Sequence, residues 1–357
     1  MVKKSEFGAL PGGEVAHIYT LAAGGITVRV SDFGATLIGI EAPDAAGNMA
    51  DIVLGHADLA GYAGANAAFY GATVAPVANR TAKGEVPLNG TVYQLVKNDA
   101  EVNNLHTDKE HGLHKRVWSA AISEDVEQGY QAVSFTAHMA DGEFGLPGER
   151  SVTAIYSLAA DGTLTLTHRM ETSKRTFANI TNHAYFNLAG HGSGDIRDQV
   201  VQIHAEQYVP IDAASIPTGE LQDAEGTPFD FTEPHTLGER IDDDDVQLTR
   251  ARGYDHCFCV GGYDEHGVLR HALHAEDPAS GRAMDVRITA PGVQLYTGNW
   301  LDDPHGKDGA SYGPRAGFAV EPEFYPDCVH HPDWPQPVCT PAEPFEAVIE
   351  YEFSTVA

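Results

Sequence analysis

Hydrophobic and polar residues alternate with a period of two wherever the chain shows a clear pattern. The segment GTLTLTHRM places Leu164, Leu166 and His168 on one face and the intervening threonines on the other. Such spacing predicts a β-strand with one buried face. The same alternation predicts strands in the segments ITVRVSDFG, AVSFTAHM, RSVTAIYSL, VVQIHAEQYVPI and FEAVIEYEF.

Turn-forming residues separate these predicted strands, in clusters such as APDAAGN, PLNGT, DGEFGLPGE and AADGT. The segment HADLAGYAGANAAFYGA is the best candidate for a short helix, although its glycines disfavour one. The sequence contains neither the alternation of strands and helices typical of nucleotide-binding sheets nor a glycine-rich phosphate loop. We therefore predict an all-β fold, in which the proline-rich HPDWPQPVCTPAEP forms a rigid surface loop before the last strand.

Composition supports a folded chain with a large core. Hydrophobic residues make up 42% of the 357 residues, and 37 glycines supply many turns. Because no flexible linker or fixed-period repeat divides the sequence, we expect one domain over residues 1–357.

The charge balance excludes several classes of partner. The chain carries 51 acidic and 22 basic side chains, a formal net charge of −29. This charge repels nucleic acid phosphates and anionic membrane surfaces. The N-terminal MVKKSEFGALPGGE lacks an apolar run, and no segment is long and apolar enough to span a membrane. We expect a cytoplasmic protein that binds neither nucleic acids nor membranes.

Two sequence clusters raise the question of a metal site. The cysteines lie at positions 257, 259, 328 and 339, with histidines nearby, but their spacing lacks the paired C-x-x-C of zinc sites. Reduced, buried thiols are the favoured interpretation. The run from Asp242 to Asp245 lacks the alternate spacing of a calcium loop, so a solvated turn is favoured there.

Five segments combine polar side chains with aromatic and turn-forming neighbours. They hold His183 in TNHAYFNL, Arg80 in PVANRTAKG, His106 in NNLHTDKEHGLHKRVW, Asp255 in GYDHCF and Glu321 in AVEPEFYPD. Each residue alone is also compatible with a structural role, since satisfied core histidines and buried ion pairs are common. For His183 the alternatives are a core histidine and a proton donor aimed at a ligand.

Taken together and in order, these segments resemble the aldose 1-epimerases, or galactose mutarotases. FGATLIGIEAPDAAGNMADIVLGHADLAGY, DGEFGLPGE, IPTGE, GTPFDF and YTGNWLDD are also similar to segments of that family, so the resemblance covers nearly the whole chain. It implies a single large β-sandwich of the galactose mutarotase type with an open sugar-binding cleft. It further implies interconversion of the α and β anomers of a free aldose such as galactose, glucose or xylose, with no metal or organic cofactor.

The resemblance assigns roles residue by residue. Glu321, the first glutamate of EPEFYPD, matches the general base, and His183 matches the general acid. The residues that match sugar-holding positions are Arg80, His106 and Asp255, with Asn79 beside Arg80. Anomer interconversion needs such a pair, because one group removes the C1 hydroxyl proton while the other protonates the ring oxygen. A carboxylate near His183 would favour its protonated form.

The sequence also departs from the family pattern. The histidine of NNLH is commonly followed there by two glycines, whereas Thr107 and Asp108 follow His106 here. His111 and His114 are therefore alternative sugar-binding residues.

Several functional alternatives stay open. Glu323 could replace Glu321 as the base, although the match favours Glu321. Trp300 is either a wall on which a sugar stacks or a core residue. A glycosidase would also use paired carboxyl groups facing a sugar. A non-catalytic sugar-binding protein could share the scaffold, but the presence of both Glu321 and His183 in matching segments argues against it.

Overall fold

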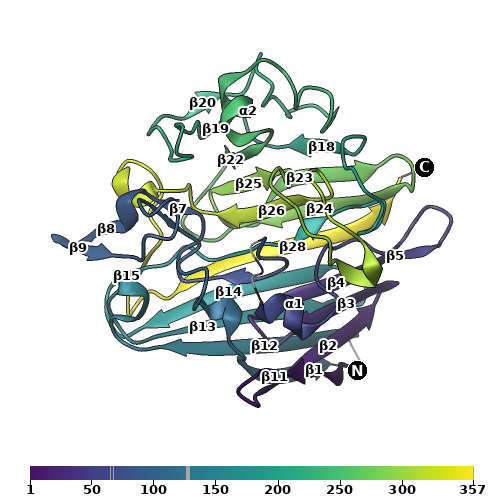
Figure 1. The fold of residues 1–357 in the computed structure, drawn as a ribbon, viewed down its shortest axis with the longest axis horizontal. Helices are drawn as coiled ribbons and strands as arrows, with labels where there is room; N and C mark the ends of the chain where they lie inside the picture. The colour runs from purple at the N-terminus through teal and green to yellow at the C-terminus, as the bar shows by residue number, and fades with distance from the viewer. Residues whose placement is uncertain (65, 67, 126–128, 357) are drawn as a thin grey trace.

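Three large antiparallel sheets form the framework of this computed structural model, which describes residues 1–64, 66, 68–125 and 129–356 (Figure 1). The five-stranded sheet has the order β1-β2-β3-β4-β5, so each strand pairs with its neighbour in the sequence. Its strands are β1 (Lys3–Ala9), β2 (Val15–Ala23), β3 (Ile26–Ser31), β4 (Thr36–Pro43) and β5 (Met49–Asp51).

The nine-stranded sheet crosses the middle of the molecule in Figure 1 in the order β11-β12-β13-β14-β28-β24-β23-β18-β21. The C-terminal strand β28 therefore lies at its centre, between β14 and β24. Its strands are β11 (Ser119–Asp125), β12 (Tyr130–Met139), β13 (Arg150–Leu158), β14 (Leu164–Thr172), β18 (Val200–Ile203), β21 (His235–Thr236), β23 (Arg270–Asp277), β24 (Arg282–Ile288) and β28 (Phe345–Thr355).

The six-stranded sheet has the order β17-β26-β25-β22-β19-β20. Its strands are β17 (Tyr185–Phe186), β19 (Gln207–Tyr208), β20 (Gln222–Asp223), β22 (Asp255–Cys259), β25 (Gly292–Tyr296) and β26 (Phe318–Glu323). Four two-stranded pairs complete the strand set of the described residues: β6 (Thr73–Val74) with β16 (Thr181–Asn182), β7 (Arg80–Thr81) with β10 (Asn104–Leu105), β8 (Glu85–Leu88) with β9 (Thr91–Gln94), and β15 (Thr176–Phe177) with β27 (Val338–Cys339).

Helices are few and short in the described chain. The predicted helical segment contains α1 (Leu59–Ala63), which the Asp58 side chain caps by accepting from the Gly61 amide. The second α-helix is α2 (Val246–Ala251), capped by Asp245. The 3₁₀ turns are Ala82–Gly84, Leu113–Lys115, Glu143–Gly145, Lys307–Gly309 and Cys328–His330. None of these helices is long and apolar enough to cross a membrane.

The predicted all-β architecture is confirmed, and the period-two faces lie where the pattern placed them. Strand β13 has the bounds of the predicted RSVTAIYSL, and in β14 residues Leu164, Leu166 and His168 are buried between less buried threonines. The buried faces of the three sheets meet in one hydrophobic cluster that includes Phe135 of β12 and Tyr208 of β19. This shared core fixes the sheets against each other.

Some local predictions need correction. The segment VVQIHAEQYVPI is not one strand: β18 belongs to the nine-stranded sheet and β19 to the six-stranded sheet. The break comes at Ala205, whose amide bonds back to the Ile203 carbonyl and so leaves the ladder. The proline-rich loop forms the short strand β27 and buries Trp334 against Tyr325.

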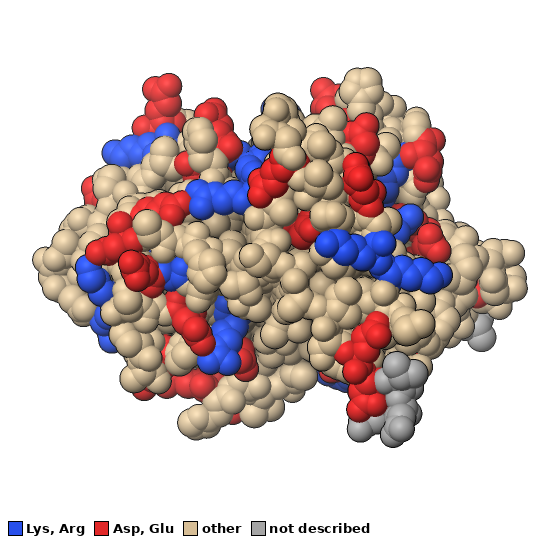
Figure 2. Space-filling model, turned by 90° about the horizontal axis from the view of Figure 1, so that it is seen from below, with Lys and Arg blue, Asp and Glu red and all other residues tan. Residues whose placement is uncertain are grey.

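The two clusters considered for metal binding have other roles. All four cysteines are free, and Cys257, Cys328 and Cys339 are buried, as the thiol interpretation expects. Positions 242–244 form an exposed turn, and Asp245 starts α2 by accepting hydrogen bonds from the Gln247 and Leu248 amides. Figure 2 shows acidic side chains spread over the face seen from below, with basic side chains among them.

Candidate active site

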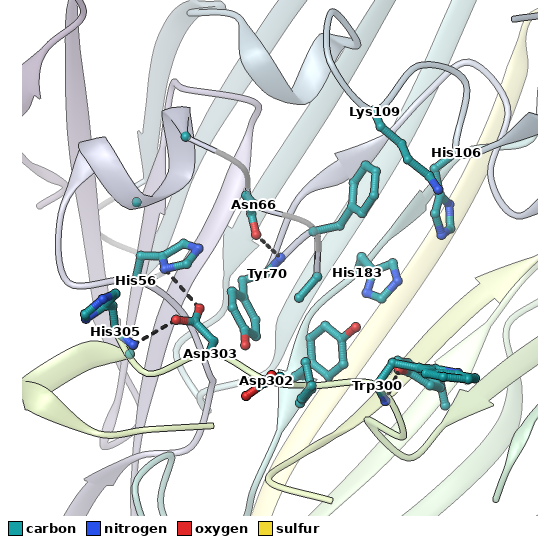
Figure 3. Close-up of a pocket in the computed structure, with 18 of the residues that line it drawn as sticks. His56, Asn66, Tyr70, His106, Lys109, His183, Trp300, Asp302, Asp303 and His305 are labelled. Atoms are coloured by element: carbon teal, nitrogen blue, oxygen red, sulfur yellow. Dashed lines mark hydrogen bonds and ion pairs between the residues drawn. The ribbon is translucent and has the colours of Figure 1, made fainter. Parts of the chain in front are cut away.

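A cavity of about 1140 Å³ contains all six residues that the sequence assigned to chemistry or sugar binding. Strands, turns and loops from distant parts of the chain supply them: Asn79, Arg80, His106, His183, Asp255 and Glu321. Figure 3 shows His106 and His183 at one end of this cavity, and His56, Asp303 and His305 at the other.

His183 and Glu321 lie against each other in the cavity wall. His183 occupies the connection between β16 and β17, and its amide donates to the Ala72 carbonyl at 2.9 Å. Glu321 lies in the middle of β26, opposite Gln294 of β25. The distance from His183 Nε2 to Glu321 Oε1 is 3.5 Å, and the two residues are 5% and 2% exposed. His183 is therefore a buried histidine that also faces the cavity.

Aromatic rings hold the His183 imidazole in place. The Tyr185 ring lies 5.0 Å from it between centroids, and the Phe69 ring is stacked at 6.0 Å. Tyr185 in turn packs edge-on against Tyr296, which also lines the cavity. Such packing limits the ring to one orientation, as a positioned proton donor requires.

Asn79 and His106 form a second fixed unit. Both have left-handed backbones, with φ of 57° and 54°. The Asn79 amide donates to His106 Nδ1 at 3.1 Å, and the His106 amide donates to the Asn79 carbonyl at 3.1 Å. Because Nδ1 accepts a hydrogen bond, the neutral ring carries its proton on Nε2. His106 is thus prepared to donate a hydrogen bond from Nε2.

Thr107 follows His106 at a position where the family commonly has a glycine, and the structure shows how a threonine is accommodated there. Its φ is 64°, a region that favours glycine. Its hydroxyl accepts from the Val77 amide and donates to the Val77 carbonyl, both at 2.9 Å. These bonds offset the backbone strain and keep the loop shape that brings His106 to the cavity.

The alternative residues lie outside the cavity lining. The His111 side chain is 77% exposed and pairs with Asp108. His114 is buried behind Phe69, with their ring centroids 4.7 Å apart. Glu323 is buried next to Asn79, away from the cavity surface. The geometry therefore favours His106 and Glu321 over these substitutes.

Arg80 and Asp255 supply charge and polarity to the same end of the cavity. Arg80 Nε donates to Asp99 Oδ2 at 3.1 Å, and Gln294 Nε2 donates to Asp255 Oδ1 at 2.7 Å. Both partners hold the functional side chain while leaving other polar atoms of the arginine and the carboxyl group available. The arrangement suits a small neutral ligand with many hydroxyl groups.

Comparison with known proteins gives the same family as the residue pattern. The sequence model of the aldose 1-epimerase family matches residues 17–352. The chain belongs to this family. Galactose mutarotase from Homo sapiens is 38% identical over 99% of this chain and 98% of its own length. Aldose 1-epimerase from Escherichia coli K12 is 35% identical over 96% of each chain.

Solved structures of the family have the same fold. Galactose 1-epimerase from Lactobacillus acidophilus superposes with a TM-score of 0.85 at 25% identity, over all of both chains. An aldose epimerase homologue from C. elegans gives 0.84 at 26% identity, over 96% of this chain and 100% of its own. The galactose mutarotase-like β-sandwich expected from the sequence is therefore confirmed.

One group within the described residues has the spacing of metal ligands. Atoms of His106, His183 and Glu321 all lie within 4.8 Å of one another. A metal-binding imidazole nitrogen must be unprotonated, whereas the hydrogen bond from Asn79 leaves the proton on His106 Nε2. This donor set is better suited to hydrogen-bonding a sugar hydroxyl than to holding a metal ion.

Burial dominates the electrostatics of the site. It lowers the pKa of His183 to about 4 and the pKa of His106 well below its ordinary value. Burial, together with Glu323 and Asp255 nearby, raises the pKa of Glu321 well above the ordinary range. The sequence led us to expect an ionised glutamate and a protonated imidazole at neutral pH. Burial instead favours the neutral form of each.

Sequence reasoning left part of the lining unassigned. At the far end of the cavity, His56 Nδ1 lies 3.4 Å from Asp303 Oδ2. Both residues occur in segments matched to the family, but no motif singled out their side chains. Trp300 is 56% exposed at the cavity mouth, with the Arg252 guanidinium 3.8 Å from its ring centroid. Core packing is thus the wrong interpretation of Trp300.

Proposed function

We propose that this protein interconverts the α and β anomers of a free aldose by opening and reclosing the sugar ring. The observation that carries the proposal is the His183–Glu321 pair, 3.5 Å apart in the wall of a cavity of about 1140 Å³ in an aldose 1-epimerase chain. Galactose is the first sugar to test, because the relatives include proteins named galactose mutarotase.

The proposed reaction needs one proton shared by this pair. Glu321, as carboxylate, removes the proton from the C1 hydroxyl while His183, as imidazolium, protonates the ring oxygen. The bond from C1 to the ring oxygen breaks and leaves an aldehyde at C1. After rotation about the bond from C1 to C2, His183 takes the proton back from the ring hydroxyl and Glu321 returns its proton to the aldehyde oxygen. Both groups end in their starting states.

The remaining residues of this cavity end are proposed to hold the sugar. His106 Nε2–H and the Arg80 guanidinium are hydrogen-bond donors, and the Asp255 carboxyl group is an acceptor for sugar hydroxyls. Asn79 fixes His106 and Arg80. Its backbone amide donates to the His106 imidazole, and its side-chain oxygen accepts from the Arg80 backbone amide at 2.7 Å.

Polarimetry tests the proposal directly. Freshly dissolved α-D-galactose, α-D-glucose and α-D-xylose are followed with the wild type, Glu321→Gln and His183→Asn side by side. We expect the wild type to accelerate mutarotation and each variant to lose about 10²- to 10⁴-fold in kcat. Acceleration that survives in both variants would reject the acid–base assignment. No acceleration by the wild type with any of these sugars would reject the function.

The alternatives are not favoured by the family assignment. A glycosidase requires two carboxyl groups that act on a glycosidic bond, whereas the proposed acid–base pair of this cavity joins a histidine to a glutamate. Reducing ends released from a disaccharide would reverse this preference.

We also propose that residues 1–357 form one domain and that the protein works in the cytoplasm. The largest hydrophobic cluster, which all three sheets share, supports the first statement. The four free cysteines suit a reducing compartment and support the second. Limited proteolysis that released a stable folded fragment would contradict the single domain.

A further inference from the structure

Glu323 is a buried carboxyl group that the proposed reaction does not use. It lies two residues after Glu321 on β26, so both side chains leave the strand on the same face. Glu323 is 1% exposed and lies outside the cavity lining. Its Oε1 accepts a hydrogen bond from Asn79 Nδ2 at 2.8 Å, while its Oε2 has no partner among the described residues.

This position is unfavourable for a carboxyl group. Burial raises the pKa of Glu323 well above its ordinary value, and Asp255 nearby raises it further. A buried polar group with one oxygen unsatisfied costs stability, and a hydrophobic side chain would fill the same space without that cost. The hydrogen bond to Asn79 is therefore the feature that this side chain contributes.

Asn79 transmits that hydrogen bond to the sugar-binding groups. Its side-chain nitrogen is fixed by Glu323, and its side-chain oxygen accepts from the Arg80 amide. Its backbone amide, held in a left-handed conformation, donates to His106 Nδ1. Release of the Asn79 side chain would let its left-handed backbone relax, and that relaxation would remove the bond that keeps the proton on His106 Nε2.

We propose that Glu323 is a positioning residue, which acts through Asn79 to hold His106 in the Nε2–H tautomer and to fix Arg80 at the cavity. The kinetic part of this inference rests on the proposed function. The tautomer part does not, because the state of the His106 ring can be observed without substrate.

Substitution at position 323 separates the hydrogen bond from the charge. Glu323→Gln keeps an oxygen that accepts from Asn79, whereas Glu323→Met fills the space without an acceptor. With galactose we expect Glu323→Met to raise KM about tenfold, the effect of one misplaced hydrogen-bond donor, with a much smaller change in kcat. Glu323→Gln should keep KM close to the wild-type value.

A control variant must show that a loss of protein stability by itself does not change KM. Asp277 is also a buried carboxylate, but it bonds to the Ser280 amide in a turn that does not line the cavity. Asp277→Ala should lower the thermal unfolding temperature without changing KM. If Glu323→Met does not fold, Glu323→Asp replaces it, because the shorter side chain withdraws its oxygens from Asn79.

Nitrogen-15 spectra of histidine-labelled protein give the second measurement, with the His106 signals assigned by their loss in His106→Gln. We expect the Nε2–H tautomer in the wild type and Glu323→Gln, and a mixture of tautomers in Glu323→Met. An unchanged tautomer together with an unchanged KM in Glu323→Met would overturn the inference. An equal rise in KM and an equal loss of the Nε2–H tautomer in Glu323→Gln and Glu323→Met would also overturn the inference, because the glutamine retains the acceptor. A wild type without mutarotation would reject the proposed function, while the spectra would still test the tautomer.

Discussion

The pH dependence of kcat/KM is the most discriminating test of the acid–base pair, because burial moves the two pKa values in opposite directions. The pKa of His183 falls to about 4, below its ordinary 6.5, and the pKa of Glu321 rises well above its ordinary 4.5. Between these two values the pair holds one proton, and that proton resides mainly on Glu321. The reactive arrangement, with the proton on His183, is a minor form of the same one-proton state.

The size of the effect follows from the His183 pKa. An imidazole with a pKa of about 4 that titrated alone would be protonated in roughly one molecule in a thousand at pH 7. The rate would then fall about tenfold for each pH unit above 4. A proton shared with Glu321 instead gives a plateau, since the population of the one-proton state does not change between the two pKa values. We therefore expect an acid limb near pH 4 and an alkaline limb at the raised pKa of Glu321.

Polarimetry with galactose below its KM measures kcat/KM, after subtraction of the buffer-catalysed rate at each pH. Acid unfolding must be separated from titration of the site. Samples are therefore held at each pH and returned to neutral pH, where full recovery of activity shows that the acid limb is reversible. An acid limb at the ordinary histidine pKa of about 6.5, in place of one near 4, would contradict the lowered pKa of His183. A steady tenfold loss per pH unit without a plateau would refute proton sharing.

Three further predictions concern stability and substrate binding. His168 is buried with neither ring nitrogen bonded, and burial lowers its pKa to about 3. The unfolded chain therefore binds a proton at pH values where the folded chain does not, and stability is lost as pH falls below about 6.5. His168→Leu should raise the free energy of unfolding in urea by about 2 kcal/mol at pH 5, because the unfolded chain protonates this histidine between pH 6.5 and pH 5 and the folded chain does not. A gain as large in the exposed His138→Leu would contradict this. Thr107→Ala should lower the free energy of unfolding by about 1–3 kcal/mol through loss of both Val77 bonds, and Thr107→Gly should lose less because glycine tolerates the left-handed backbone; equal losses would contradict the strain argument. Trp300→Ala should raise KM for galactose with kcat unchanged if sugars stack on this ring, and an unchanged KM would exclude stacking.

The sequence predicted the sheets better than their connections. Alternation alone located β12, β13, β14 and β28 of the nine-stranded sheet, because each has one face in the core and the period-two pattern records that burial. It did not locate β11, β21, β23 or β24. It could not show that the chain changes sheets at Ala205, since β18 and β19 have the same local pattern and differ only in their partners. Those partners, on β23 and β22, lie fifty or more residues away in sequence.

The candidate site was predicted as a set of residues but not as a geometry. Family segments identified Glu321 and His183, and the structure brings them to 3.5 Å. No local pattern could reveal that Thr107 replaces a glycine by bonding to the Val77 backbone, because that bond joins segments thirty residues apart. The protonation states were also predicted in the opposite direction, since a sequence shows a neighbouring carboxylate but not how completely water is excluded.

Exclusion of water from this pair links its chemistry to the rest of the fold. In water, the solvent already stabilises a carboxylate and an imidazolium separately. Moving a proton between them there therefore gains little free energy. In the cavity wall burial disfavours both ions, so the proton stays mainly on Glu321, and the ion pair formed when it moves to His183 is held together by an attraction that water would screen. The same burial holds His168 and His256 neutral, with pKa values near 3, so acid weakens the core by the mechanism that tunes the site. Replacing a core histidine by a hydrophobic residue should therefore extend acid stability without moving the acid limb of kcat/KM, because that limb belongs to the His183–Glu321 pair.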